Sequence, residues 1–160
     1  MSEVERLPNA GVRVPPPLLF AIPWLAGYAL GRMKPIPIVT RNAAPEFSVF
    51  GWALIGIWLV LMVWAVISFR GARTSLLPYK PATAFVTTGP YRLSRNPMYV
   101  SLGALYLGMA CLLNTLWLVV LFPLAVWLLQ HFVIEREELY LASAFGRDYQ
   151  EYCARVRRWI

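Results

Sequence analysis

Two groups of charged side chains flank the most apolar half of this chain. Arg92 and Arg95 belong to the segment GPYRLSRNPMY, residues 89–99, and a pair of glutamates belongs to EREELYLASAFGRDYQEY, residues 135–152. Guanidinium groups bind carboxylates and phosphates through paired N–H donors. Carboxylates bind arginine, ammonium groups and hydroxyls. If the fold brings the two groups together, they would form a ligand site.

The stretch between these groups, residues 97–134, contains no Asp, Glu, Lys or Arg. One helical membrane crossing needs about 20 apolar residues, so this stretch is long enough for about two crossings. We expect a helical hairpin that turns near Asn114 and Thr115. Such a hairpin would return both charged groups to the same face of a membrane.

The composition of the whole chain also indicates a membrane protein. Of its 160 residues 59% are hydrophobic and 14% are charged, and its mean hydropathy is +0.55. A soluble domain carries about 25% charged residues. The sequence therefore predicts one all-α integral membrane domain over residues 1–160, with no separate soluble domain. The net charge of +7 follows from basic loops beside apolar spans, so we expect no nucleic-acid partner and the lipid bilayer as the environment.

The apolar pattern predicts four membrane spans followed by an amphipathic cytoplasmic helix. Residues 70–96 carry five basic and no acidic residues, and four spans place this loop on the same side as both termini. Basic loops face the cytoplasm, so we expect cytoplasmic termini in a bacterial inner membrane. The predicted spans are 16–30, 47–69, 97–113 and 116–134, and the amphipathic helix is 135–158.

Each candidate side chain also has an ordinary interpretation. A juxtamembrane arginine commonly anchors a span in anionic lipid, and adjacent glutamates commonly form a solvated helix face. Two features favour a site. Asn96 and Pro97 fix Arg95 at a helix start, where free amide hydrogens attract anions. Glu138 shares a helix face with aromatic residues at three- and four-residue steps; the face is Glu138, Ala142, Phe145, Tyr149 and Tyr152.

The remaining polar residues of interest are expected to be structural. His131, near the end of the fourth span, is interpreted as an interfacial histidine. Cys111 and Cys153 are interpreted as packing residues, because two isolated cysteines make neither a disulfide framework nor a metal site. Gly146 would weaken the amphipathic helix locally or allow a close approach to its backbone.

At these motifs the chain resembles a known superfamily. The order GPYRLSRNPMY, apolar hairpin, EE-x-x-L-x-x-x-F-G-x-x-Y-x-x-Y is similar to that of isoprenylcysteine carboxyl methyltransferases and phospholipid methyltransferases. The resemblance covers about residues 74–160 and includes the loop TSLLPYKPATAFVTTGPYR. It implies S-adenosylmethionine as methyl donor, held by residues that map onto Tyr91, Arg92, Arg95, Asn96, Pro97, Tyr99, Glu137 and Glu138. Asn96 stands where the family often has histidine, and Ser101 where it often has glycine.

The resemblance also suggests roles for two residues as catalytic groups. Methyl transfer from a sulfonium needs positioning and exclusion of water more than acid–base chemistry. Arg95 would orient a carboxylate acceptor, and Glu138 would hold the ammonium or ribose of the cofactor, so that the two face each other across it. The acceptor would be a lipophilic small molecule or a lipidated group that enters from the bilayer, with no metal involved. Whether the methylation is on O, N or S stays open.

Two other functions are compatible with the sequence. Membrane sterol reductases resemble the same C-terminal half but use a nicotinamide cofactor and have more spans. A small membrane scaffold or assembly protein would need no ligand at all. It would tolerate replacement of Arg95 and Glu138 without loss of function.

Overall fold

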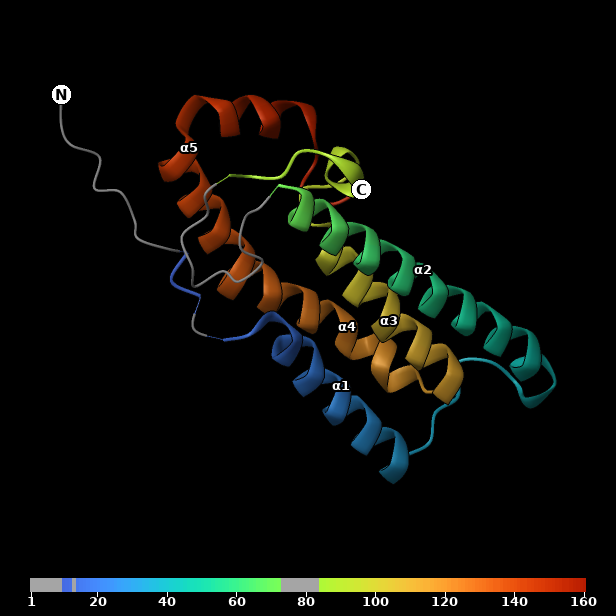
Figure 1. Ribbon diagram of the computed structural model, residues 1–160. Helices are drawn as coiled ribbons and strands as arrows, with labels where there is room; N and C mark the ends of the chain where they lie inside the picture. The colour runs from blue at the N-terminus through green and yellow to red at the C-terminus, as the bar shows by residue number, and fades with distance from the viewer. Residues whose placement is uncertain (1–9, 13, 73–83) are drawn as a thin grey trace.

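The computed structural model describes residues 10–12, 14–72 and 84–160, and these parts are helical, with no β-strand among them. In Figure 1 the helices α1 to α4 pack side by side, and α5 first continues the line of α4 and then crosses one end of the bundle. The loop residues 74–83, which belong to the predicted cofactor-binding half, lie outside the described residues. The elements are α1 Pro16–Met33, a 3-10 turn Arg41–Ala43, α2 Ala44–Gly71, a 3-10 turn (η2) Gly89–Arg92, α3 Pro97–Leu113, α4 Leu116–Leu129, a π-helical turn Gln130–Ile134 and α5 Glu135–Arg155.

The predicted hairpin is present, with the turn at the predicted residues. Asn114 adopts the left-handed conformation (φ 44°, ψ 49°) that ends α3, a role for which asparagine is the second choice after glycine. Its side chain also fixes the loop before α2: Oδ1 accepts the amide N–H groups of Ile38 and Val39, both at 3.0 Å, and Nδ2 donates to the Val39 carbonyl at 3.0 Å. One asparagine therefore joins both turns at this end of the bundle.

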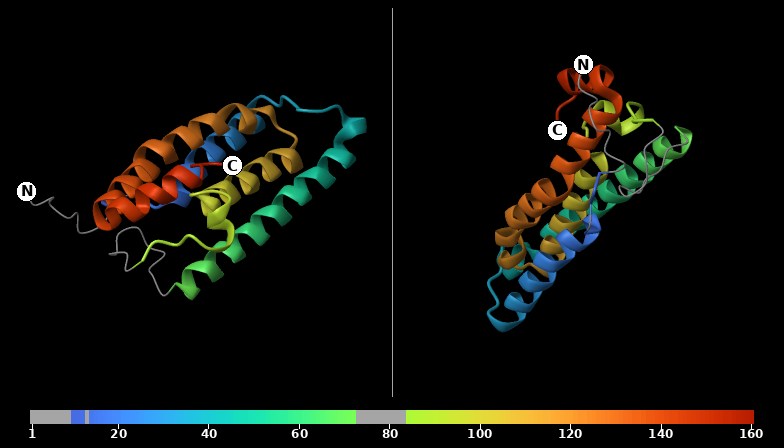
Figure 2. Two further views of the ribbon diagram at one scale, coloured as in Figure 1. Left: turned by 90° about the horizontal axis from the view of Figure 1, so that it is seen from above. Right: turned by 90° about the vertical axis from the view of Figure 1, so that its left-hand side faces the viewer.

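The hairpin forms the centre of the bundle, with α2 packed along α3 and α1 packed along α4 (Figure 2). Small residues allow these approaches. A Cβ on Gly108 would lie 2.9 Å from the Gly51 carbonyl oxygen, and one on Gly27 would lie 3.3 Å from the Leu118 backbone. Close helix contact through glycine is typical of packing in membranes, where apolar burial gives no driving force.

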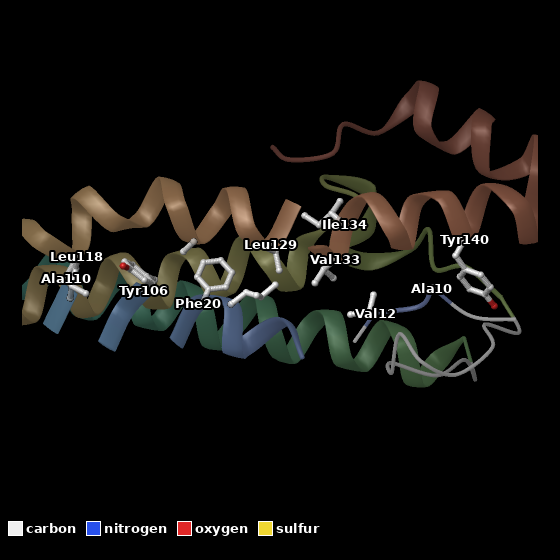
Figure 3. Packing of buried hydrophobic residues seen from close by; sticks show 12 residues of the cluster. Ala10, Val12, Phe20, Tyr106, Ala110, Leu118, Leu129, Val133, Ile134 and Tyr140 are labelled. Carbon is white, nitrogen blue, oxygen red and sulfur yellow. The ribbon is translucent and has the colours of Figure 1, made fainter. Parts of the chain in front are cut away.

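Buried residues of α1, α3, α4 and α5 share one apolar core (Figure 3). Leu118, Leu129, Val133 and Ile134 are fully buried. The outer face of α2 is different, since Val49, Trp52, Val60 and Ile67 are each more than half exposed. A continuous apolar helix face of this kind is stable in lipid rather than in water.

Among the residues that the structure describes, two helices, Arg41–Gly71 and Leu116–Arg155, are long and apolar enough to cross a membrane; α3 is apolar but shorter, with 17 residues. The expectation of four spans is therefore confirmed only in part. The first predicted span is a helix, with Pro23 inside it, but α1 does not reach the hydropathy of a membrane crossing. Its prolines, glycines and Arg32 lower the apolar content of its 18 residues.

The expectation of one continuous helix over 135–158 is wrong. Gly146 has φ 52° and ψ −120°, a non-helical conformation inside α5, and the helix ends at Arg155. Such backbone angles are accessible to glycine and costly for other residues. The chain therefore reverses at Gly146 and folds back across the end of the bundle (Figure 1). The proposed shared face is divided as well, with Glu138 before the bend and Tyr149 after it.

Candidate functional site

The two charged motifs meet at one end of the bundle, where α3 begins and α5 begins. The turn η2 is held against the end of α2 by Gly89, whose φ of 62° favours glycine and whose missing side chain leaves room for Ser68 and Trp64. Pro97 is the first residue of α3, as expected, a position that proline favours. These elements hold the segment 93–96 beside the first half of α5.

Glu138 is the centre of an ion-pair cluster. Its Oε1 lies 3.3 Å from Arg95 Nη2, and its Oε2 lies 2.6 Å from Arg158 Nη2. Arg158 Nε also donates to Glu138 Oε1 at 3.1 Å, so Arg158 binds both carboxylate oxygens. The Glu138 side chain is only 18% exposed. The hydrogen bond with Glu138 raises the pKa of Arg158.

Arg95 and Glu138, which the sequence hypothesis places on opposite sides of a bound cofactor, are in direct contact. The reversal at Gly146 brings a second guanidinium, that of Arg158, and the thiol of Cys153 to the same place. Arg95 Nη1 donates to Cys153 Sγ at 2.6 Å. Within the described part of the chain, Arg95 Nε is buried and has no hydrogen-bond partner. A ligand placed between Arg95 and Glu138 would have to separate them, whereas one beside them would meet a donor that is still free.

Glu137 forms a second polar pair with α3. The Tyr99 hydroxyl donates to Glu137 Oε1 at 2.8 Å. Burial raises the pKa of Glu137 to about 7, the hydrogen bond from Tyr99 lowers it and the neighbouring charge of Glu138 raises it. Glu137 can therefore be neutral or charged near neutral pH, while Glu138 beside it is paired with two arginines.

The two departures from the family pattern, Asn96 and Ser101, are both accommodated by hydrogen bonds within the protein. Asn96 Nδ2 donates to the Arg158 carbonyl at 3.0 Å, so Asn96 connects the motif to the residues that follow α5. Ser101 is fully buried and donates to the Met98 carbonyl at 2.7 Å. The hydroxyl is thus satisfied inside α3 without a ligand.

The start of α3 offers fewer amide donors than expected. Pro97 has no amide hydrogen, and the Tyr99 amide donates to the Asn96 carbonyl at 3.0 Å. Anion binding at this helix start would therefore depend on the guanidinium groups more than on backbone N–H groups.

Tyr91 and Arg92 differ in placement from the rest of the predicted set. Tyr91 is 7% exposed and packs against Phe69, with ring centroids 5.4 Å apart. Its carbonyl accepts the Tyr152 hydroxyl at 2.7 Å. Burial raises the pKa of the Tyr91 phenol far above its usual range, and Tyr152 and Glu137 add to the effect. Arg92 is exposed and takes no part in the contacts that hold the cluster.

The aromatic residues of the bent tail cover the other side of the cluster. Phe85 contacts Phe145, Tyr149 and Tyr152, with ring centroids 5.0, 5.8 and 5.8 Å apart. Burial raises the pKa of Tyr152 to about 12, while nearby Arg95 lowers it. Tyr149 and Tyr152 lie close enough to Arg95 to interact with its charge, and apolar surroundings of this kind strengthen charge interactions.

Sequence reasoning missed Arg158 and Cys153 as members of the site. The only sequence signal for Arg158 is its place in VRRWI just after the tyrosine motif, and a basic residue beside a membrane has many other uses. His131, in contrast, is where an interfacial histidine is expected. It is exposed, lies 3.3 Å from Glu135 and stacks on Trp127 with ring centroids 5.7 Å apart.

The donors and acceptors of the cluster suit a small ligand with mixed charge. Arg95 and Arg158 against Glu138 leave one positive charge in excess, with the buried Arg95 Nε available to an anion. Glu137 supplies a carboxyl group whose charge can change near neutral pH. A molecule such as S-adenosylmethionine carries a carboxylate, an ammonium and hydroxyls, so the residues present fit its polar groups.

Comparisons with known proteins support a family assignment. The chain matches the phospholipid methyltransferase family over residues 47–148. It is 30% identical over 113 residues, 71% of its length, to the cobalt-zinc-cadmium resistance protein CzcN of Cupriavidus metallidurans. It is 44% identical over 66 residues, 39% of its length, to an uncharacterized protein of Haemophilus influenzae, all of which is covered.

The relatives differ in length, and the chain spans about half of the CzcN protein, 48% of its residues. No solved structure matches the chain significantly. The matched region 47–148 contains most of α2, the hairpin, Arg95 and both glutamates, and leaves Arg158 outside. The helical bundle, the charged site at its end and the family match over more than half of the chain together show that this protein belongs to the phospholipid methyltransferase family, membrane methyltransferases of the isoprenylcysteine carboxyl methyltransferase-like superfamily.

Proposed function

We propose that this protein is an integral membrane methyltransferase that uses S-adenosylmethionine and acts on a lipophilic acceptor, with a carboxylate as the leading acceptor class. The observation that carries the proposal is the cluster of Arg95, Glu138 and Arg158 at the end of an apolar hairpin. A desolvated cluster of this kind costs free energy and offers little stability in return. Its position beside the family motifs favours a binding role.

Bound S-adenosylmethionine supplies an electrophilic methyl group. The proposed binding residues lie in and beside the cluster. Arg95, with its free Nε–H, would hold a carboxylate of donor or acceptor, and Glu137 and Glu138 would hold the ammonium and hydroxyl groups of the donor. Asn96 and Pro97 fix the direction of Arg95, Tyr99 orients Glu137, and Tyr91 and Arg92 form the adjoining turn. Arg95 and Glu138 are also the proposed catalytic residues, because they would orient the reacting groups.

The bundle explains how two unlike molecules would reach one site. The polar cluster lies just beyond the apolar hairpin, and the outer face of α2 is apolar along its length. A lipophilic acceptor can approach along lipid-facing helices, and a water-soluble donor from the charged end. We place that end, together with both termini, on the cytoplasmic side of the inner membrane, because its loops carry most of the basic residues.

The test is calorimetric binding of S-adenosylhomocysteine to the purified, detergent-solubilised protein, with NADPH as the control ligand. We expect a micromolar Kd for S-adenosylhomocysteine and no heat from NADPH. Binding of NADPH alone would support the nicotinamide-dependent reductase instead. Binding of neither ligand would support the scaffold function, and the proposal would be abandoned.

Once donor binding is established, the acceptor class can be tested with the same protein. The protein would be allowed to transfer a radioactive methyl group to a lipid extract, and the labelled products would then be distinguished by their stability in base. Methyl esters release methanol in mild base, whereas N-methyl and S-methyl products do not. A base-labile product would support the carboxylate acceptor, and a base-stable product would replace it with an amine or thiol.

A further inference from the structure

The residues after α5 return to the family motif and bind it through their backbone. Val156 is extended (φ −122°, ψ 129°). The Arg95 amide donates to the Arg157 carbonyl at 2.9 Å, and Ser94 Oγ and Asn96 Nδ2 donate to the Arg158 carbonyl at 3.2 and 3.0 Å. We name residues 156–159 the strap.

The strap is fixed in place rather than loosely attached. Three hydrogen bonds connect it to residues 94–96, and Trp159 packs against the main apolar core. The backbone of Arg158 therefore has little freedom to swing away from the site. A side chain on an anchored backbone is suited to hold a partner in one position and poorly suited to act as a gate.

The geometry of Arg158 on Glu138 is the kind that fixes orientation. Nη2 to Oε2 is 2.6 Å and Nε to Oε1 is 3.1 Å, so one planar guanidinium holds both oxygens of one carboxylate. Two contacts in one plane define the rotation of the carboxylate as well as its place. Arg95 alone, with a single contact at 3.3 Å, would leave that rotation undefined.

Acidic and titratable groups near the Arg158–Glu138 pair disfavour the negative charge of Glu138, so a second cation stabilises that charge. Glu137 is its sequence neighbour and Tyr149 lies close enough to feel its charge. Glu135 also acts on Arg158. Among the described residues, Arg95 and Arg158 are the cations paired with Glu138. Removal of Arg158 would leave a partly buried carboxylate with one off-centre partner.

We propose that Arg158, presented by the strap, is a positioning residue that holds the Glu138 carboxylate in the orientation needed to bind the methyl donor. This inference rests on the proposed function and adds a residue to its site. Arg158 acts through Glu138 and need not touch the ligand. The role depends on a guanidinium at this place and on the acid it orients.

The test compares Arg158→Ala and Arg158→Lys with Arg157→Ala. Arg157 is the matched control because it is next in the chain, has the same charge and is exposed, and its backbone carbonyl is kept. S-adenosylhomocysteine affinity is measured by calorimetry in detergent. We expect Arg158→Ala to weaken binding by roughly tenfold to a hundredfold, as for the loss of a charged hydrogen-bonded pair. Arg158→Lys should lose less, and Arg157→Ala should bind like the wild type.

Two further measurements separate positioning from general support of the fold. Methylguanidinium in the buffer should restore part of the affinity of Arg158→Ala and leave the affinity of Arg157→Ala unchanged. If Arg158→Ala were only a structural defect, added methylguanidinium would not restore its affinity. In a double-mutant cycle, Glu138→Gln combined with Arg158→Ala should bind no more weakly than Glu138→Gln alone, because the two residues act as one unit.

Three outcomes would overturn the inference. They are wild-type affinity in Arg158→Ala, strictly additive losses in the cycle, or failure of methylguanidinium to act on a folded Arg158→Ala protein. In each case the wild-type protein still binds S-adenosylhomocysteine, so the proposed function survives. If the wild-type protein binds no S-adenosylhomocysteine, the proposed function falls and the inference falls with it.

Discussion

The hydroxyl of Tyr99, on the first turn of α3, donates a 2.8 Å hydrogen bond to Oε1 of Glu137 on α5. This contact joins the two family motifs by a route independent of the arginine cluster. It also lowers the pKa of a carboxyl group that burial raises to about 7. The pair therefore gives the protein a pH dependence that can be measured without any ligand.

Stability is expected to fall as the pH rises from about 4.5 to about 7. In this window the folded state holds the Glu137 proton, while the unfolded chain, in which this carboxyl has its ordinary pKa of 4.5, has lost it. The folded state binds more protons, so stability decreases with pH and is level above about 7. Glu137→Gln should remove this fall, giving a Tm at pH 8 roughly 5–10 °C closer to that at pH 5. Thermal unfolding in detergent measures it.

The control for this prediction is Glu151→Gln, an exposed carboxylate paired with Arg147 at 3.1 Å. Its pH dependence should match that of the wild type, because exposed pairs contribute little. Tyr99→Phe should extend the fall to higher pH, since the bond that lowers the Glu137 pKa is lost. An unchanged pH profile in Glu137→Gln would show that this carboxyl titrates normally.

Arg95→Ala and Glu138→Ala should each abolish S-adenosylhomocysteine binding while leaving a folded protein in detergent. Each substitution leaves partly buried charges without their partner, and truncating one member of such a pair costs roughly 2–5 kcal/mol in binding. Calorimetry gives the affinity, and size-exclusion chromatography checks the fold. Arg147→Ala, an exposed member of an exposed pair, is the matched control. Near-wild-type affinity in both cluster variants would remove them from the site.

Gly146→Ala should destabilise the protein by about 1–3 kcal/mol. A Cβ at this position would meet nothing within 4 Å, so the cost comes from the backbone angles alone. The substitution should also weaken ligand binding, because the bend at Gly146 directs the strap to the site. Gly56→Ala is the control: Gly56 lies in α2 with open space around it, and alanine there should be neutral or stabilising. Equal effects of the two substitutions on Tm and affinity would argue against the bend as the cause.

Both termini and the charged site are predicted to face the cytoplasm. In a background where Cys111 and Cys153 are replaced by alanine, single cysteines at Lys34 and Arg157 report the two ends of the bundle, since both positions are exposed. A membrane-impermeant maleimide should label Lys34→Cys in intact cells and Arg157→Cys only after lysis. The reverse pattern would invert the topology, and labelling of both or neither would contradict a bundle that spans the membrane.

The hairpin and its ends could be predicted from the amino-acid sequence. Pro97 begins α3, Asn114 lies at the turn and α4 begins at Leu116, all as predicted. These boundaries follow from local physics: proline fixes φ, asparagine tolerates the left-handed conformation, and an uncharged stretch has a length that can be compared with a bilayer. The hairpin likewise predicted that the motifs containing Arg95 and Glu138 would return to one end of the bundle, and in the structure both lie there, in direct contact.

Other features depended on distant parts of the chain and were not readable from local pattern. A glycine in a helical pattern is compatible with a continuous helix, so the reversal of the chain at Gly146 depends on tertiary packing. That reversal brings Arg158 to Glu138 and Cys153 to Arg95. Ion-pair partners are set by where backbones lie in space, because a carboxylate interacts with whichever cation the fold brings within a few ångströms. Local sequence identifies residues able to bind charge, and the tertiary fold selects their partners.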